Sequence, residues 1–368
     1  MTAIGIDLPD GRHYDVVVGH DILQSLGERC RNLGLGDRCT LITDAALTDN
    51  LATVAAVSLR DTGFEVLTVP YAAGEGGKNL ASVETLVGAM LEAGFGRGAW
   101  VVALGGGVVG DLGGFVAASF LRGVDVVQVP TTVLAQVDAS IGGKTAVNHP
   151  LGKNLIGAFH PPRLVLTDTA ALQSLPPAEV ASGLAEIVKH GIIRDAELFG
   201  FLEERVEDVV DAKLTGHELV WLIARNARIK ADVVSADERE GSLRAILNYG
   251  HTIGHAIEAA TSYKRYRHGE AVLLGMIAAS ELAARRGLWE SSADRERHDG
   301  LIERLGIPAG VGDVDAATIT ERTKADKKRV GGRHRFVLAR RIGAVDIVDG
   351  IDDDQVRATI DALQARCG

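Results

Sequence analysis

Histidine and carboxylate side chains recur at helical spacing in the second half of the chain. His251 and His255 are four residues apart in a predicted helix, so their side chains share one face. His268 begins another expected helix, and Glu186 lies on a third. Two histidines and one carboxylate with an open position are typical of a catalytic metal site. Capping or core hydrogen bonding is the alternative for any single histidine. A zinc-protease H-E-x-x-H motif is excluded because Thr252 stands where its glutamate would be.

A glycine-rich turn follows a predicted buried strand at 99–104. Gly105, Gly107 and Gly110 match G-x-G-x-x-G, and a helix is expected over 112–121. Glycines let backbone N–H groups approach a pyrophosphate, and a helix N-terminus favours its negative charge. The turn therefore predicts a dinucleotide site, although it is not the first strand–helix turn of the chain. A tight turn that only packs against a neighbouring strand is the alternative.

Two lysines directly follow further glycines, Lys144 after a glycine pair and Lys153 after a single glycine. The segment 140–145, Ser-Ile-Gly-Gly-Lys-Thr, lacks the G-x-x-x-x-G-K-[ST] spacing of a P-loop, so a nucleoside-triphosphatase is excluded. Lys144 and Lys153 nevertheless place two ammonium groups near flexible backbone, which suits an anionic ligand. A solvated loop is the competing interpretation.

Two kinds of hydrophobic pattern divide the chain. Strands are expected at 14–18, 39–43, 64–69, 100–104, 124–129 and 164–167, with a helix at 80–93, and the first of these strands could form a hairpin with the extreme N-terminus. Beyond Pro177, helices are expected at 178–193, 214–234, 243–260 and 270–286, with a strand pair at 335–338 and 345–348. Five of the nine prolines fall between Pro150 and Pro177. We therefore expect an α/β domain over 1–175, with a mainly parallel sheet, and a mainly α-helical domain over 176–368.

Composition limits the class of partner and the compartment. The 368 residues carry a net charge of −10, so we expect no binding to nucleic acid. The three cysteines form no C-x-x-C pair, which favours reduced thiols. The N-terminus lacks a signal-peptide pattern, and the longest apolar run, 99–110, is too short and glycine-rich to span a bilayer. We expect a cytoplasmic protein with no membrane contact.

Several motif blocks together resemble 3-dehydroquinate synthase, a sugar-phosphate cyclase. They are Gly-Gly-Gly-Val-Val-Gly-Asp at 105–111, Gln-Val-Pro-Thr-Thr at 128–132, Val-Asp-Ala-Ser-Ile-Gly-Gly-Lys-Thr at 137–145, Gly-Lys-Asn at 152–154, Ser-Gly-Leu-Ala-Glu-Ile-Val-Lys-His-Gly at 182–191, Asp-Glu-Arg-Glu at 237–240, Leu-Asn-Tyr-Gly-His-Thr-Ile-Gly-His-Ala at 247–256 and His-Gly-Glu-Ala-Val at 268–272. The blocks span most of the chain in order, and jointly they are specific.

The resemblance implies an N-terminal NAD-binding α/β domain, a C-terminal helical metal- and substrate-binding domain, and a homodimer. It implies the shikimate-pathway conversion of 3-deoxy-D-arabino-heptulosonate 7-phosphate to 3-dehydroquinate and phosphate. In that reaction a substrate hydroxyl is oxidised by NAD⁺, phosphate is eliminated, the carbonyl is reduced, and the ring closes by an aldol step. Net redox is zero.

The resemblance also implies site residues. The metal ligands would be Glu186, His251 and His268, with Zn²⁺ the expected ion and Co²⁺ the alternative. The substrate and catalytic residues would be Arg122, reaching into the partner subunit's site, and Asp138, Lys144, Asn154, Lys189, Lys230, Glu240, Arg244, Asn248 and His255, together with Lys327 or Lys328. The NAD-binding residues would be Asp44, Glu75, Lys78, Gly107, Val108, Val109, Gly110, Asp111, Thr131, Thr132, Lys144 and Lys153.

Three other functions compete with this interpretation. A cyclase of the same fold could act on sedoheptulose 7-phosphate or glucose 6-phosphate, which lack the carboxylate that Arg244, Asn248 and His255 favour. A metal-dependent alcohol dehydrogenase would not need so many phosphate-directed cations. A non-catalytic NAD-binding regulator would not need three metal ligands and a set of basic site residues.

Overall fold

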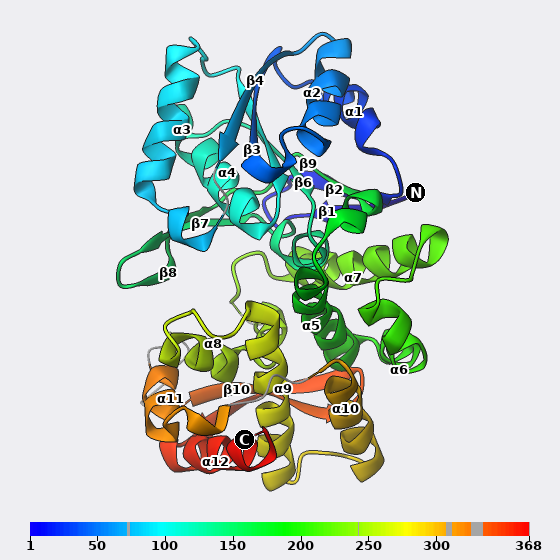
Figure 1. The fold of residues 1–368 in the computed structure, drawn as a ribbon, viewed down its shortest axis with the longest axis vertical. Coiled ribbons are helices and arrows are strands. Elements are labelled where there is room, and N and C mark those ends of the chain that lie inside the picture. Colours follow the sequence, from blue (N-terminus) through cyan, green and yellow to red (C-terminus); the bar gives the residue numbers. More distant parts are fainter. Residues whose placement is uncertain (72–73, 242, 307–310, 325–333, 368) are drawn as a thin grey trace. The chain divides into compact units, whose positions relative to one another are not determined.

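The computed structural model describes the whole chain except residues 72–73, 242, 307–310, 325–333 and 368. It separates into two compact units (Figure 1). Unit 1 comprises Met1–Leu175 and Thr215–Arg239, and unit 2 comprises Pro176–Leu214 and Glu240–Gly368. This partition differs from the division expected from the sequence in one segment, because helix α7 (Gly216–Ala236) packs against strands β1 and β2 of unit 1.

A seven-stranded sheet forms the centre of unit 1. Its strands are β1 (Thr2–Asp7), β2 (His13–Gly19), β3 (Arg38–Asp44), β4 (Glu65–Tyr71), β5 (Trp100–Gly105), β6 (Val126–Pro130) and β9 (Leu164–Asp168). They lie in the order β1-β2-β9-β6-β5-β3-β4, and every neighbouring pair is parallel except the β1–β2 hairpin. The six expected strands, the hairpin and the mainly parallel sheet are thus confirmed.

Helices cover both faces of this sheet (Figure 1). On one face, α1 (Leu26–Asn32) and α2 (Leu51–Asp61) pack on the side chains of Trp100 and Val102. On the other, α3 (Leu80–Glu92) and α4 (Gly107–Ser119) pack on Val101 and Val126. Burial on both faces explains why these strands are continuous apolar runs in the sequence. Helix α4 begins at Gly107, five residues earlier than expected.

The order of the strands defines where a ligand can approach unit 1. The connection after β3 passes through α2 on one face, whereas the connection after the adjacent β5 passes through α4 on the other. Such a switch point leaves a crevice at the carboxyl ends of the two strands, where α/β proteins bind ligands. Asp44 ends β3 and Gly105 ends β5, so both lie at this edge.

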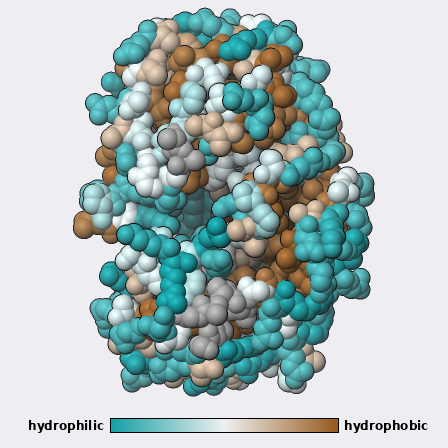
Figure 2. Space-filling model, in the orientation of Figure 1, coloured by the Kyte–Doolittle hydropathy of each residue, from teal (hydrophilic) through white to brown (hydrophobic). Residues whose placement is uncertain are grey.

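Smaller elements complete unit 1. A two-stranded antiparallel sheet joins β7 (Lys144–His149) to β8 (Gly152–Phe159). Short helices η1 (Leu23–Ser25), η2 (Ala45–Leu47), η3 (Glu75–Gly77), η4 (Phe120–Arg122) and η6 (Thr169–Ser174), and the π-helix η5 (Ala135–Ala139), connect the strands. Figure 2 shows a largely hydrophilic face with scattered apolar patches. The β8 residues Leu155 and Phe159 are among the exposed large apolar side chains.

Unit 2 is mainly helical. Its elements are α5 (Pro177–Arg194), α6 (Ala196–Val210), η7 (Leu243–Asn248), α8 (His251–Ala260), α9 (His268–Arg285), α10 (Ser292–Arg304), η8 (Val311–Asp313), α11 (Ala316–Thr323), the antiparallel strands β10 (His334–Arg341) and β11 (Ala344–Ile351), and α12 (Asp353–Cys367). An α/β unit with a helical companion is the expected fold class. No helix among the described residues has the length and apolar character needed to cross a membrane.

The single helix expected over 243–260 is wrong, because the chain breaks between η7 and α8. Gly250 has φ 78° and ψ −23°, a left-handed conformation that stops η7 and starts α8 in a new direction. This turn presses on α9: a Cβ at Gly275 would lie 1.8 Å from the Gly250 carbonyl oxygen. The start of α8 therefore depends on a close backbone contact that only glycine permits at position 275.

Gly275→Ala should destabilise unit 2, because the added methyl meets backbone that cannot move without unpacking α8 from α9. Overpacking of this kind costs about 1–3 kcal/mol, which lowers the melting temperature by several degrees. The control is Gly200→Ala in α6, where a Cβ would meet nothing within 4 Å; it should be neutral or stabilising by up to about 1 kcal/mol. Equal melting temperatures for the two variants would contradict this account.

Candidate metal and nucleotide sites

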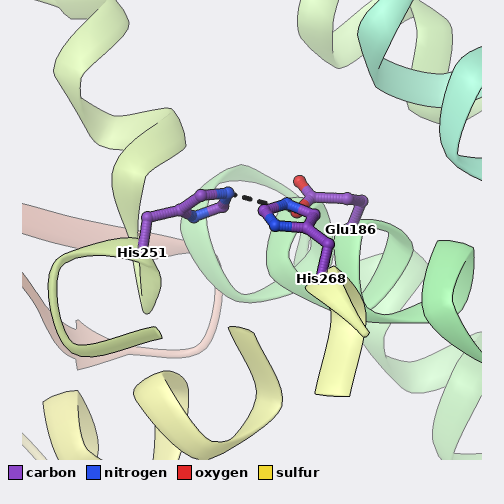
Figure 3. Close-up of side chains that lie close together, drawn as sticks. All are labelled: Glu186, His251 and His268. Atoms are coloured by element: carbon purple, nitrogen blue, oxygen red, sulfur yellow. Dashed lines mark ion pairs between the residues drawn. The ribbon is translucent and has the colours of Figure 1, made fainter. Parts of the chain in front are cut away.

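Glu186, His251 and His268 converge from three helices of unit 2, α5, α8 and α9 (Figure 3). Glu186 Oε1 lies 3.3 Å from His251 Nε2 and 3.6 Å from His268 Nε2. The Glu186 side chain is only 1% exposed. A carboxylate oxygen and two imidazole nitrogens thus face one another in the interior of the unit.

Close packing of α5 against α9 brings His268 to Glu186. The N–H of Gly269 donates to Ser182 Oγ at 3.1 Å, and a Cβ at Gly269 would lie 2.1 Å from the Ser182 carbonyl oxygen. Ser182 precedes Glu186 by one helical turn, so the two share a face of α5. The glycine after His268 is therefore what allows the imidazole to reach the carboxylate.

Hydrogen bonds behind the two imidazoles leave their Nε2 atoms facing Glu186. His251 Nδ1 donates to the Tyr249 carbonyl oxygen at 3.0 Å, which leaves Nε2 as an acceptor. His268 Nδ1 lies 3.4 Å from Glu258 Oε2, so a buried carboxylate stands behind this ring as well. A backbone carbonyl and a carboxylate are the usual outer partners of metal-binding histidines.

This arrangement fits a divalent cation. Neither oxygen of Glu186 has a hydrogen bond among the described residues, although Lys189 forms an ion pair with Oε2. The lone pair of His251 Nε2 and an oxygen of Glu186 would repel each other unless a cation lay between them. Tetrahedral ligands about 2.0–2.2 Å from zinc stand about 3.3–3.5 Å apart, close to the separations found. The three residues supply three ligands, one fewer than the four of a tetrahedral zinc site.

Neighbouring charges and burial shift the pKa values of the three side chains. Burial raises the pKa of Glu186, but Lys189 and His251 outweigh it and hold that pKa well below its ordinary value. Burial also disfavours the charged form of His268, yet Glu186 and Glu258 raise its pKa to about 10. Burial lowers the pKa of His251, against the influence of Glu186. A bound metal would displace the proton from His268.

The remaining expected residues of unit 2 lie on the same few elements. Lys189 is buried on α5, one turn after Glu186. Arg244 is buried in η7, and Asn248 at the end of η7 donates to Glu240 Oε1 at 2.7 Å. His255 lies one turn after His251, with its ring centroid 5.8 Å from that of His268. Lys327 and its alternative, Lys328, lie outside the described residues.

A polar network in unit 1 joins several residues expected to bind NAD. Lys78 Nζ lies 2.8 Å from Asp111 Oδ2, 2.6 Å from Asn154 Oδ1 and 3.4 Å from Glu75 Oε1. Burial raises the pKa of Asp111 more than Lys78 lowers it. Burial also opposes ionisation of Glu75, but Lys78 holds its pKa below the ordinary value. Asn154, expected to contact substrate, thus shares the Lys78 ammonium with two residues expected to contact the nucleotide.

The glycine-rich segment lies at the switch-point edge of the sheet. Gly107, Val108, Val109, Gly110 and Asp111 form the first turns of α4. Helix N-termini leave N–H groups without helical partners. Thr131 and Thr132 follow β6, and the Thr131 N–H donates to the Gly105 carbonyl oxygen at 2.9 Å. Asp44 caps η2 by accepting from the Ala46 N–H at 2.9 Å.

Other expected residues of unit 1 occupy short elements beside this edge. Asp138, in the π-helix η5, accepts a hydrogen bond of 2.6 Å from Lys230 of α7. Lys144 begins β7, and Lys153 lies on β8. Arg122 ends η4, is exposed and has φ 73°.

The sequence analysis missed two residues of these sites, Asn148 in the Lys78 network and Glu258 behind His268. Asn148 donates to Glu75 Oε1 at 2.7 Å and accepts from the Asn154 N–H at 2.9 Å, so it links the two halves of the Lys78 network. Glu258 stands behind His268. Its spacing of seven residues from His251, two helical turns, was the available signal. Asn148 had none, because its contacts depend on the β7–β8 pairing.

Family models and a relative of known name match most of the chain. A family model described as "3-dehydroquinate synthase N-terminal" matches residues 68–182, and one described as "3-dehydroquinate synthase C-terminal" matches residues 183–329. A 3-dehydroquinate synthase of Nostoc punctiforme is 45% identical over 368 residues, which cover 99% of this chain and 100% of the relative.

Two solved structures are also similar over nearly the whole chain. A 2-deoxy-scyllo-inosose synthase complexed with carbaglucose-6-phosphate, NAD⁺ and Co²⁺ has a TM-score of 0.87 and 28% identity, covering 98% of this chain and 99% of the other. A 2-epi-5-epi-valiolone synthase from Streptomyces hygroscopicus, with NAD⁺ and Zn²⁺ bound, has a TM-score of 0.87 and 29% identity, covering 96% and 97%. The expected fold class is confirmed.

Glu186→Gln should abolish zinc binding, because it keeps the shape of the side chain but removes the charge that two neutral imidazoles require. After dialysis against zinc, metal analysis should find about one ion per wild-type chain and below about a tenth in the variant. Glu179→Gln is the matched control, since Glu179 lies on the same helix but is half exposed and 3.6 Å from Arg267. Full zinc content in Glu186→Gln would remove this residue from the ligand set.

Proposed function

The chain belongs to the 3-dehydroquinate synthase family, and on that premise we propose that it converts 3-deoxy-D-arabino-heptulosonate 7-phosphate to 3-dehydroquinate and phosphate. The observation that carries this proposal is the full-length similarity to the Nostoc relative, which far exceeds the similarity to the two other cyclases. The reaction is a step of the shikimate pathway, which leads to the aromatic amino acids. It makes the protein a carbon–oxygen lyase.

NAD⁺ and a divalent cation are the proposed cofactors, as in the two solved cyclases. The cation would be held by Glu186, His251 and His268. The short distances between Glu186 Oε1 and the two Nε2 atoms support this ligand set. NAD⁺ would be held at the switch-point edge by Asp44, Glu75, Lys78, Gly107, Val108, Val109, Gly110, Asp111, Thr131, Thr132, Lys144 and Lys153. When bound, the two groups supply a reversible hydride acceptor and a Lewis acid for the hydroxyl that is oxidised.

Lysine and arginine side chains would bind the substrate's phosphate and carboxylate groups, which suit charge-assisted hydrogen bonds. The proposed basic contacts in unit 1 are Arg122, Lys144 and Lys230, and Asp138 and Asn154 are proposed beside them. Those in unit 2 are Lys189, Glu240, Arg244, Asn248 and His255, with Lys327 or Lys328 as a further basic contact.

Two ion-pair or hydrogen-bond partners support these roles. Asp138 holds the Lys230 ammonium at 2.6 Å, so this buried cation has a fixed position. Glu240 holds the Asn248 amide at 2.7 Å, which leaves the amide oxygen to accept a hydrogen bond from a substrate hydroxyl. His255, exposed beside His268, is placed to hold or move a proton.

The protein would act as a homodimer in the cytoplasm. The exposed Arg122, in a strained left-handed conformation at the end of η4, would reach the partner subunit's site. Among the described residues, Cys30 and Cys39 are buried free thiols, which suits a reducing compartment.

Purified protein should release inorganic phosphate from the heptulosonate phosphate without accumulating NADH. A metal chelator should stop the release, and added zinc should restore it, because the proposed ligands bind reversibly. Phosphate and the absorbance of NADH are measured together. Stoichiometric NADH formation would contradict the proposal and support an alcohol dehydrogenase.

Arg244→Lys tests the choice of substrate, because only a planar guanidinium can hold a carboxylate through two parallel hydrogen bonds. A lost charge-assisted contact costs about 1.5–3 kcal/mol, and each ~1.4 kcal/mol is tenfold. kcat/KM for the heptulosonate phosphate should therefore fall roughly tenfold or more. The half-exposed Arg341→Lys is the control and should change nothing.

The result that would contradict this assignment is measured with sedoheptulose 7-phosphate, which has no carboxylate. If the wild type turns it over as well as the heptulosonate phosphate, and Arg244→Lys leaves both rates unchanged, a cyclase for neutral sugar phosphates replaces this assignment.

A further inference from the structure

The imidazole of His251 is joined to a second polar cluster in unit 2, which the proposed chemistry does not use. Its Nδ1 donates to the carbonyl oxygen of Tyr249 at 3.0 Å. The hydroxyl of the same Tyr249 lies 2.9 Å from His298 Nε2, on helix α10. One residue thus contacts a proposed metal ligand through its backbone and a buried histidine through its side chain.

The cluster continues from His298 to the C-terminal helix. His298 Nδ1 lies 2.7 Å from Asp299 Oδ1. The same oxygen accepts from Ser280 Oγ of α9 at 2.8 Å, and Asp299 Oδ2 accepts from Arg366 of α12 at 2.7 Å. We call Tyr249, His298, Asp299 and Arg366 the buried relay. It ties the start of α8 to α10 and α12.

Asp299 accepts every hydrogen bond that it makes in the buried relay. An ionised Asp299 only accepts, so Nδ1 of His298 donates to it. In a neutral ring with Nδ1 protonated, Nε2 of His298 accepts from the hydroxyl of Tyr249. Burial opposes ionisation of Asp299, but His298, Arg366 and Ser280 hold its pKa at about 2. The Tyr249 hydroxyl thus bonds to a histidine that Asp299 orients.

The side chains of Tyr249 and His298 are fully buried and satisfied by one another and by Asp299. Tyr249 and His298 are both 0% exposed, and the His298 ring is bonded on both sides, to the Tyr249 hydroxyl and to Asp299. Apolar side chains would fill this space without the desolvation cost of a carboxylate, an imidazole and a phenol. The polar cluster contacts the backbone beside His251, and this contact points to a role that apolar packing would not supply.

The peptide between Tyr249 and His251 needs such an anchor. Gly250, the residue between them, is in the left-handed region and has no side chain to hold it. Close contact with α9 restrains it on one side, where a Cβ would lie 2.6 Å from Met276 Cγ. The Tyr249 side chain is the attachment on its N-terminal side. A change in the backbone angle ψ of Tyr249 would turn the carbonyl oxygen away from His251 Nδ1, and the held side chain restrains the residue against it.

We propose that Tyr249, His298 and Asp299 are positioning residues for the metal, which fix the carbonyl oxygen that orients His251 toward the cation. The proposal deepens the proposed function and rests on its metal site. It assigns to α10 and α12, which supply none of the proposed ligands, an influence on metal affinity.

Tyr249→Phe is the deciding variant, because it removes one hydroxyl and keeps the ring. The zinc dissociation constant of the metal-free protein is measured by competition with a chromophoric chelator, and the melting temperature is measured in excess chelator. Loss of a direct outer partner of a ligand weakens binding by about 10–100-fold. The Tyr249 hydroxyl does not itself contact His251 but restrains the residue whose carbonyl oxygen does. We therefore expect a smaller effect, with zinc binding weakened by about 3–10-fold.

Ser280→Ala is the matched control. It removes a buried hydrogen bond to the same oxygen of Asp299 but leaves the path from Tyr249 to Asp299 complete. Both variants should lower the melting temperature, but the zinc dissociation constant of Ser280→Ala should stay within about twofold of the wild type. A purely structural cluster would move the melting temperature of both and the zinc affinity of neither.

An unchanged zinc affinity in Tyr249→Phe, or equal weakening in Ser280→Ala, overturns the positioning role. If Tyr249→Phe fails to fold, Arg366→Gln decides, since this side chain lies at the surface end of the relay. Weaker zinc binding in that variant supports the proposal, and unchanged binding overturns it. A wild-type protein that binds no zinc overturns the metal site itself, which is a separate failure of the proposed function.

Discussion

One buried carboxylate oxygen, Oε1 of Glu186, faces two imidazole nitrogens whose other ring nitrogens are already committed to hydrogen bonds. Burial of the Glu186 carboxylate beside these nitrogens requires a cation or protons among them. This requirement explains why α5, α8 and α9 approach so closely that glycine is needed at 269 and 275. It also explains why the hydrogen-bond partners behind the imidazoles are buried and specific. The close packing of α5, α8 and α9 thus holds a buried carboxylate against two imidazoles, an arrangement that fits a cation.

Unit 1 follows a different constraint, the geometry of a parallel sheet. The carboxyl ends of β3, β5 and β6 meet at one edge, so Asp44, Gly107 and Thr131, distant in the sequence, lie along the same edge of the sheet. Lys78 is buried beside Asp111 and Asn154 at the same unit's β7–β8 hairpin. Anionic ligands suit such an edge even in a chain whose net charge is −10.

The sequence predicted the strands of the sheet more accurately than the helix boundaries and the contacts of the site. Buried parallel strands are continuous apolar runs, so the six sheet strands were found within a few residues. The helix expected over 243–260 was wrong because helical periodicity continues across Gly250, whereas its left-handed backbone does not. Polar helix α10 carries little apolar periodicity and was missed. The roles of Glu258, Tyr249 and His298 depend on tertiary contacts, one of them through a backbone carbonyl, which no residue spacing encodes.

Anomalous diffraction at the zinc absorption edge, from crystals grown with zinc, would test the central claim most directly. The account predicts one strong peak at about 2.0–2.2 Å from Glu186 Oε1, His251 Nε2 and His268 Nε2. His255, Glu258 and His268 also bring ligand atoms within 4.8 Å of one another and form the competing set. A peak among those three residues, with Glu186 more than about 3 Å from the ion, would contradict the account.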